Sequence, residues 1–177
     1  MKQRILNAGC GKETFGTHFI DLYPQRPGVK KIDANHQKLP YPQNYFHKIY
    51  CKNLFEHLNN PLFFLRQCKR VLKPGATLEL TTDNAAFWLW HNQKGRRIHY
   101  GGYEKNSEGG KDDKHYALYT PNHLANWLQA AGFKEMEWWY DGEQKDLAPV
   151  LQLANAAISR TRFAPMAFPK ISLEAIK

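Results

Sequence analysis

Short apolar runs alternate with amphipathic segments over the first 82 residues of the chain. This alternation is typical of strands that take turns with helices in an α/β domain. The runs predict strands at residues 4–8, 18–22, 29–32, 48–51 and 77–82. A helix is predicted at 61–72, because apolar residues recur there every three or four positions and Pro74-Gly75 follows as a turn. Its stripe consists of Leu62, Leu65, Cys68, Lys69 and Leu72.

The second half of the chain is less regular. Thr120 and Pro121 are typical of a helix start and Gly132 of a helix end, which predicts a helix between them with a buried face. That face consists of Leu124, Trp127, Leu128 and Ala131. Further on, the pattern predicts a strand at 133–140, an amphipathic helix at 146–160 and a last strand at 171–176.

Residues 84–115 show no clear period, and irregular segments of this length are usually functional or mobile. We expect them to form a lid over a substrate site. Trp88 and Trp90 would then line that site, with core filling as the alternative. The length of 177 residues predicts one domain, 1–177, in which 141–177 supplies the C-terminal helix and the last strand.

The composition narrows the class of protein. With 42% hydrophobic and 14% aromatic residues, the chain is not of the disordered class. No apolar run approaches the roughly 18 residues of a membrane span, so we expect no membrane association. The three cysteines are scattered, which together with the polar start predicts a cytoplasmic protein. The histidines show no ligand spacing, so no metal site is predicted.

The net charge of +9 is spread over the first half of the chain, apart from one tight basic cluster at 94–97. Diffuse positive charge favours anionic partners weakly. An anionic acceptor or nucleic acid is therefore one reading, and a merely solvated surface is the favoured one. The sequence does not indicate the oligomeric state.

The most informative group is a glycine turn followed by two aspartates. Gly9-Cys10-Gly11 ends the first predicted strand, while Asp21 and Asp33 end the second and third. In a parallel α/β sheet, ligands bind outside these strand ends. One carboxylate can accept the hydroxyl hydrogens of a ribose, and the other can accept from an adenine amine. The dinucleotide-binding motif needs a glycine where the chain has Thr14, and a P-loop needs a glycine where it has Leu6. Without a phosphate-binding loop, the two carboxylates favour a cationic nucleoside ligand such as S-adenosylmethionine.

Several segments occur in the order known from one family. They are 5–11, 19–22, 33–34 with 39–42, 55–58, 70–75, 118–121 and 131–133. With them the sequence resembles the class I S-adenosylmethionine-dependent methyltransferases, closest to the small subgroup with a Leu-Asn-x-Gly-Cys-Gly start. The resemblance implies an α/β, Rossmann-like, doubly wound and mostly parallel seven-stranded sheet. Its antiparallel last strand, 171–176, would lie between the fifth and sixth strands.

The resemblance also implies a cofactor site and two departures from the family. The cofactor-binding positions would be Asn7, Ala8, Gly9, Cys10, Gly11, Asp21, Leu22, Asp33, Ala34, Cys51 and Asn53. Asn7 stands where the family usually has an acid, and Glu13 replaces a glycine. Only nine residues, 9–17, join the first two strands, fewer than a helical crossover needs. The first helix should therefore be truncated or absent.

Methyl transfer to an oxygen or nitrogen atom can require a base, for which histidine is the usual side chain. The candidates are His57, His115 and Tyr119. A helix-start histidine bonded to the backbone is the alternative for His57, and surface loop positions are the alternative for the other two. Two further functions stay open: a module that binds S-adenosylmethionine without turnover, and a basic nucleic-acid-binding protein.

Overall fold

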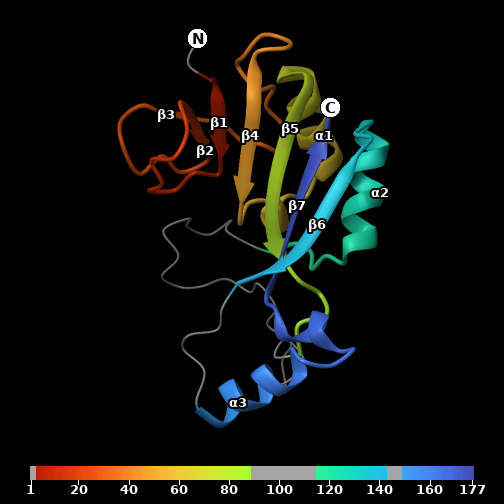
Figure 1. The fold of residues 1–177 in the computed structure, drawn as a ribbon. Helices are drawn as coiled ribbons and strands as arrows, with labels where there is room; N and C mark the ends of the chain where they lie inside the picture. The colour runs from red at the N-terminus through yellow and green to blue at the C-terminus, as the bar shows by residue number, and fades with distance from the viewer. Residues whose placement is uncertain (1–2, 89–114, 143–148) are drawn as a thin grey trace.

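The computed structural model describes residues 3–88, 115–142 and 149–177, which form a seven-stranded sheet with helices on one face (Figure 1). The strand order is β3-β2-β1-β4-β5-β7-β6. The strands are β1 (Ile5–Ala8), β2 (His18–Asp21), β3 (Val29–Lys31), β4 (Phe46–Lys52), β5 (Leu72–Asp83), β6 (Met136–Asp141) and β7 (Lys170–Ile176).

The first five strands are parallel, and β7 runs antiparallel to both of its neighbours. It lies between β5 and β6, with Leu80 opposite Leu173 on one side and Trp138 opposite Leu173 on the other. The predicted α/β, Rossmann-like and mostly parallel seven-stranded sheet is therefore confirmed, including the position of the last strand.

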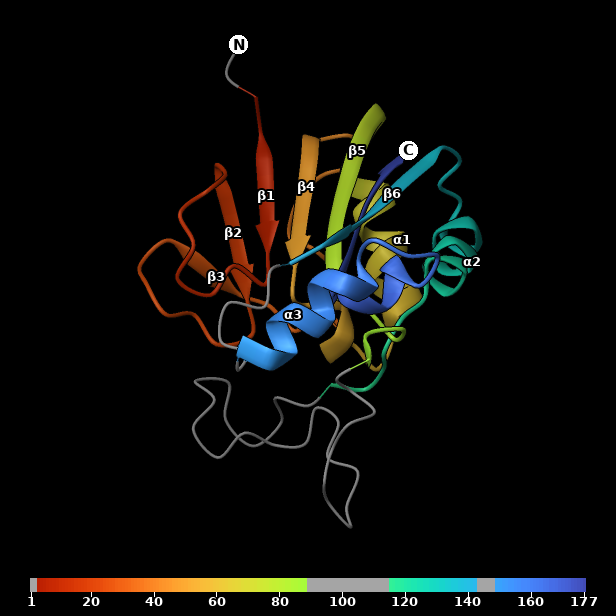
Figure 2. The same ribbon diagram turned by 60° about the horizontal axis from the view of Figure 1, so that its bottom comes forward.

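Two helices cover one face of the sheet. They are α1 (Pro61–Val71), next to β5, and α2 (Pro121–Ala131), on the side of β6, and they pack against each other (Figures 1 and 2). The ends of α2 are those expected from the sequence: the Thr120 hydroxyl accepts from the His123 N–H, and Gly132 has φ +89°. Short 3-10 turns occur at Phe55–His57 (η1) and Ala164–Ala167 (η4).

The core lies between this sheet face and the two helices. Alternate strand residues such as Leu6, Ile49 and Leu78 are fully buried there, together with Phe64 and Leu65 of α1. The pleat directs every second side chain of a strand to one face, so these residues fix which face is covered.

The other face of the sheet carries polar side chains. Lys48 of β4 makes ion pairs with Glu79 of β5 (2.5 Å) and Glu174 of β7 (3.1 Å). Beside them the hydroxyls of Thr81 and Ser172 are 2.8 Å apart. Such a face does not need an apolar cover, which agrees with the chain having no helix in residues 9–17, all of which the structure describes.

The third helix, α3 (Pro149–Ile158), lies beyond the carboxyl ends of β4 and β5 (Figure 1). The sequence predicts an amphipathic helix here, and Leu151, Ala154 and Ile158 are half-buried as that face requires. Val150, expected on the same face, is 70% exposed. No helix among the described residues has the length and apolar character to cross a lipid bilayer.

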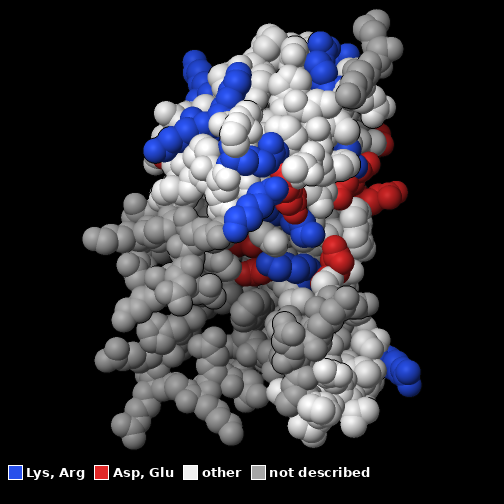
Figure 3. Space-filling model, turned by 90° about the vertical axis from the view of Figure 1, so that its left-hand side faces the viewer, with Lys and Arg blue, Asp and Glu red and all other residues white. Residues whose placement is uncertain are grey.

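Figure 3 views the molecule from the β3 edge and shows Lys and Arg side chains scattered over the described surface, with Asp and Glu among them. Most of the predicted lid (residues 89–114) lies outside the described residues, as does the cluster at 94–97.

Candidate functional site

A cavity of about 580 Å³ opens at the carboxyl ends of β1, β2 and β3 and is bordered by η1. This is the edge of the sheet at which a parallel α/β fold binds its ligands. Its lining comprises Gly9, Gly11, Ile20, Asp21, Leu22, Tyr23, Lys31, Ile32, Asp33, Ala34, Asn35, His36, Asn53, Leu54, His57, Leu58, Asn59 and Tyr116.

The glycine turn forms one wall of the cavity. The Gly9 N–H donates to the carbonyl oxygen of Ile20 at 2.9 Å, which holds the turn against β2. Gly9 and Gly11 have φ of +69° and +48°, a region that favours glycine. A Cβ atom on Gly9 would lie 2.8 Å from the Cβ of Leu54, so the close approach also excludes a side chain.

Asp21 is the best-oriented acid of the cavity. Its Oδ2 accepts from the Gly11 N–H and its Oδ1 from the Tyr23 N–H, both at 2.8 Å. Two backbone donors therefore fix the plane of the carboxylate at the end of β2. Each carboxylate oxygen keeps a lone pair for a further donor, such as a hydroxyl of a bound sugar.

Asp33 lies at the end of β3, and its Oδ1 accepts from the Asn35 N–H at 2.9 Å. The Oδ1 of Asn35 in turn accepts from the N–H groups of Asn59 and Asn60, which joins this loop to the segment before α1. The Arg70 guanidinium donates to the carbonyl oxygens of Leu39 and Tyr41 at 2.8 Å, and so anchors the connection that follows.

The structure brings seven of the predicted cofactor positions to the cavity wall: Gly9, Gly11, Asp21, Leu22, Asp33, Ala34 and Asn53. The other four are Asn7, Ala8, Cys10 and Cys51, which are buried and are not among the lining residues. Burial raises the pKa of the Cys51 thiol, and burial with the nearby Asp21 charge raises that of Cys10.

Asn53 follows β4 with φ +50°, which is uncommon for a residue other than glycine. Its N–H donates to the Thr81 carbonyl oxygen at 2.9 Å, so pairing with β5 maintains this conformation. The strained backbone turns the chain towards Leu54 and His57, which line the cavity with it.

Two of the candidate bases come together beside the cavity. The rings of His57 and His115 are 4.3 Å apart in an edge-to-face arrangement. The Nδ1 of His115 lies 3.0 Å from the Oδ2 of Asp83. The hydrogen bond to Asp83 raises the pKa of His115, although partial burial of the ring opposes the shift. The Asp83 carboxylate would stabilise the imidazolium that forms when His115 accepts a proton.

Asp83 belongs to a buried charged cluster that the sequence reading did not identify. Asp83 and Glu56 are 2% and 1% exposed, and Lys170 pairs with both. The Thr82 hydroxyl donates to Glu56 at 2.9 Å. The pairing of β5 with β7 places Asp83 opposite Lys170, a contact between positions far apart in the sequence.

Tyr119 is 4% exposed and packs against Phe55, with ring centres 5.0 Å apart. Burial raises the pKa of its phenol to about 12. Its backbone also pairs with the strand end, since its N–H donates to the Asp83 carbonyl oxygen at 3.1 Å. These contacts favour a role in the core over a role as base.

Further lining residues are sequence neighbours of the predicted ones. Tyr23, Ile32 and Leu54 each adjoin a predicted position, so the strand-end argument could have found them. Tyr116 could not have been found in this way. Its N–H donates to the Glu56 carbonyl oxygen at 2.7 Å, which places the segment after residue 114 against η1.

Solved structures share this fold. An S-adenosylmethionine-dependent methyltransferase from Archaeoglobus fulgidus is 15% identical and has a TM-score of 0.63, with 99% of this chain and 86% of that chain covered. A possible histamine N-methyltransferase from Thermotoga maritima is 16% identical and also has a TM-score of 0.63, with coverages of 100% and 83%. Phosphoethanolamine N-methyltransferase 2 from Haemonchus contortus, in complex with S-adenosyl-L-methionine, is 13% identical with a TM-score of 0.58, and the chain covers 48% of it.

These neighbours agree with the cofactor that the sequence predicts. A search of curated protein sequences found no match. The family model described as "Methyltransferase domain" matches residues 2–137, which include the glycine turn, both aspartates and all of α1. The chain therefore belongs to the methyltransferase domain family.

Proposed function

We propose that the protein transfers the methyl group of S-adenosylmethionine to an oxygen or nitrogen atom of an acceptor. The observation that carries this proposal is the Asp21 carboxylate, which two backbone N–H groups hold at the rim of the cavity. A pre-oriented carboxylate at the end of β2 suits the two hydroxyls of a ribose. The family match supports the same reading.

The other lining residues suit the rest of the cofactor. Asp33 and Ala34 would contact the adenine, while Gly9 and Gly11 would let the amino-acid end approach the backbone closely. The sulfonium supplies a methyl carbon that is already activated for displacement. The protein then mainly has to align the acceptor with that carbon, and alignment can lower a barrier by roughly 7–11 kcal/mol at best.

His115 is the base that the geometry favours. Asp83 holds its Nδ1, which would orient the ring for taking a proton from the acceptor. Lys170 pairs with both Asp83 and Glu56 and so offsets part of the charge of these two buried carboxylates. His57 packs against the His115 ring from the cavity side and would orient it.

The first experiment is isothermal titration of the protein with S-adenosylmethionine and S-adenosylhomocysteine, with NAD and ATP as controls. We expect binding of the first two alone. Asp21→Ala should weaken that binding by about 1–3 kcal/mol, the cost of an unmade charged hydrogen bond. Glu135→Gln, at an exposed position away from the cavity, is the matched control. Equal affinity of Asp21→Ala and the wild type would refute the proposed site.

A second candidate is a module that binds the cofactor without turnover. The observation in its favour is the link of residues 9–17, which replaces the first crossover helix and leaves Phe15 55% exposed. An acceptor screen separates the two candidates. It starts with histamine and phosphoethanolamine, for which two of the similar proteins are named. Binding without product over a broad screen would favour the second candidate.

A further inference from the structure

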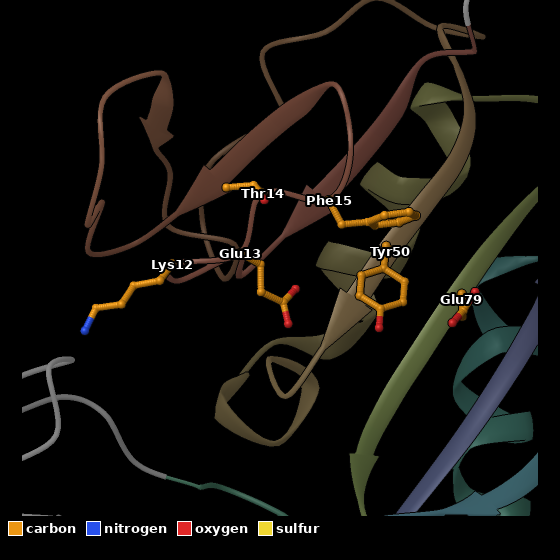
Figure 4. A pocket seen from close by; sticks show the side chains of 6 residues that line it. All are labelled: Lys12, Glu13, Thr14, Phe15, Tyr50 and Glu79. Atoms are coloured by element: carbon orange, nitrogen blue, oxygen red, sulfur yellow. The ribbon is translucent and has the colours of Figure 1, made fainter.

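A second hollow, of about 600 Å³, lies on the polar face of the sheet. It is lined by Lys12, Glu13, Thr14, Phe15, Tyr50 and Glu79 (Figure 4). We call it the Tyr50 hollow. The loop at 9–17 separates it from the cofactor cavity, since Gly9 and Gly11 line the cavity and the next four residues line the hollow. Tyr50 lies on β4 three residues before Asn53, which lines the cavity.

Two aromatic rings form the apolar part of the Tyr50 hollow. Phe15 and Tyr50 meet edge to face, with ring centres 5.4 Å apart. Phe15 is 55% exposed, which is a large exposure for a phenylalanine fixed against another ring. Exposed aromatic faces carry negative electrostatic potential and attract organic cations.

Two carboxylates lie beside these rings. Glu13 and Glu79 line the hollow, and Glu79 makes an ion pair with Lys48 at 2.5 Å. Burial and the charges of Glu13, Glu79 and Asp141 raise the pKa of Tyr50, with Lys48 opposing them. In Figure 4 the Glu13 carboxylate is on the Tyr50 side of the loop, whereas Lys12 extends away from the rings. Lys48 thus partly neutralises Glu79, and Glu13 supplies the second carboxylate of the hollow.

The buried side chain of Asn7 holds two residues of the Tyr50 hollow in place. It is 1% exposed and lies beside Tyr50 in the sheet register. Its Nδ2 donates to the Glu13 carboxylate (3.1 Å) and to the Phe15 carbonyl oxygen (3.2 Å), two residues of the hollow's wall. Its Oδ1 is buried and makes no hydrogen bond with the described residues. The Asn7 amide therefore fixes the positions of Glu13 and Phe15 relative to the sheet.

We propose that the Tyr50 hollow binds an organic ammonium group, and that the methyl acceptor is an amine. This inference rests on the proposed function for the transfer step, but the binding site itself does not depend on it. Anionic acceptors would meet the Glu13 and Glu79 carboxylates, and neutral ones would gain nothing from them. An alkylammonium ion satisfies both the carboxylates and the ring faces.

An amine arrives protonated at neutral pH and must lose one proton before it reacts. The nitrogen lone pair then forms the bond to the methyl carbon as the carbon–sulfur bond breaks, and the electrons of that bond return to sulfur. A transfer to a primary amine leaves a secondary ammonium and S-adenosylhomocysteine. The first proton goes to the base or to water, so no further reactant is needed.

The test compares choline with its neutral isostere 3,3-dimethylbutan-1-ol by isothermal titration, using the full chain. We expect choline to bind and the alcohol to bind about two- to fivefold more weakly, the range of an exposed cation–π contribution. Glu13→Gln and Phe15→Leu should each weaken choline about fivefold or more. Glu137→Gln, the same change at an exposed position of β6, should leave the affinity unchanged.

Repeating the choline titration with protein saturated with S-adenosylhomocysteine shows whether the hollow holds the ammonium group of an acceptor or that of the cofactor. Choline affinity that is unchanged by S-adenosylhomocysteine supports a separate acceptor site. Competition between the two would overturn the proposal, because the hollow would then hold the cofactor's own ammonium group. Equal affinity for choline and the alcohol would also overturn it. If choline binds and S-adenosylmethionine does not, the ammonium site stands and the proposed function fails.

Discussion

Gly9 and Gly11 belong to one turn but need to be glycine for different reasons. Both have positive φ, which costs a residue with a Cβ about 1–2 kcal/mol. Only at Gly9 would a Cβ meet another atom, the Leu54 Cβ at 2.8 Å, whereas nothing lies within 4 Å at Gly11.

The two alanine variants should therefore differ in stability. We expect Gly11→Ala to lower the free energy of unfolding by about 1–2 kcal/mol, and Gly9→Ala to lower it by clearly more. Urea unfolding followed by circular dichroism measures both. Equal losses would mean that Leu54 moves aside without cost. A serine at Gly28, where φ is also positive and the space is open, controls for backbone strain outside the site.

The raised pKa of His115 makes the stability contributed by the His115–Asp83 pair depend on pH. Because the hydrogen bond to Asp83 raises this pKa above 6.5, the folded state binds the proton more tightly than the unfolded state. The stabilisation by this pair is complete below pH 6.5 and is lost as the pH rises through the raised pKa. Activity as a base changes in the opposite direction, since it needs the neutral ring.

Asp83→Asn should lower the His115 pKa and move the acidic limb of the pH–rate profile to lower pH. NMR titration of the imidazole resonances measures the pKa directly, with the exposed His123 as internal control. If the His115 pKa does not change in Asp83→Asn, the hydrogen bond to Asp83 does not control the protonation of His115.

The sequence identifies some site residues and not others for a reason that lies in the strand pleat. Asp21 ends β2 and Asp33 follows β3, where the chain turns at the cavity, so their positions suffice to place them. Ala8 ends β1 and Cys51 lies within β4, but both side chains belong to the hydrophobic core, although they adjoin site residues. Asp83 and Lys170 meet only through the β5–β7 pairing, which no local pattern indicates.

At the scale of elements, the boundaries of the helices follow local chemistry more closely than their buried faces do. Both α1 and α2 begin at a proline as predicted. The stripe of α1 is shifted by one position, since Phe64 and Val71 are buried while Lys69 is only partly so. A charged residue inside an apolar period is a weak guide, because its stem can pack while its ammonium group stays in water.

β5 begins earlier than the pattern predicts, because Leu72 already pairs with Phe46 of β4. The register then shifts, so that Lys48 pairs with Thr77, and the Pro74-Gly75 turn lies within the strand as an irregularity. Gly75 has a positive φ of 72°, but the pairing on both sides of it could not be deduced from the local pattern.

The polar sheet face depends on one lysine. Glu79 and Glu174 are direct neighbours across β5 and β7, and like charges in this position repel. Lys48 bridges them, with its side chain 28% exposed. The missing apolar cover over this face is thus matched by a network of charges in the strands themselves.

Lys48→Met should lower the free energy of unfolding by less than about 1 kcal/mol, since the pairs are partly exposed. The loss should shrink when Glu174→Gln is present, because the repulsion is then removed. A double-mutant cycle by urea unfolding measures this coupling. Lys134→Met, at an exposed position, is the control. Additive losses would show that Lys48 does not mediate between the two acids.

For the whole molecule, the sign of the net charge is a poor guide to the sites. The charge of +9 weakly favours anionic partners, yet Asp21 and Asp33 line the cofactor cavity and Glu13 and Glu79 line the Tyr50 hollow. On the β3 edge the basic side chains are dispersed among acidic ones (Figure 3). Nucleic-acid binding would need them aligned along one surface. The local placement of charge therefore decides the ligand class.

The buried cysteines give this protein a built-in labelling assay. Cys51 on β4 and Cys68 on α1 are both 0% exposed, and burial raises the pKa of each thiol. A thiol reagent reaches them only when the core opens. Cys10 lies in the glycine turn, so a local opening of that turn suffices to expose it. The rate of its modification would then report how often the empty site opens, and slower modification with S-adenosylhomocysteine present would mark the turn as the part that the ligand closes.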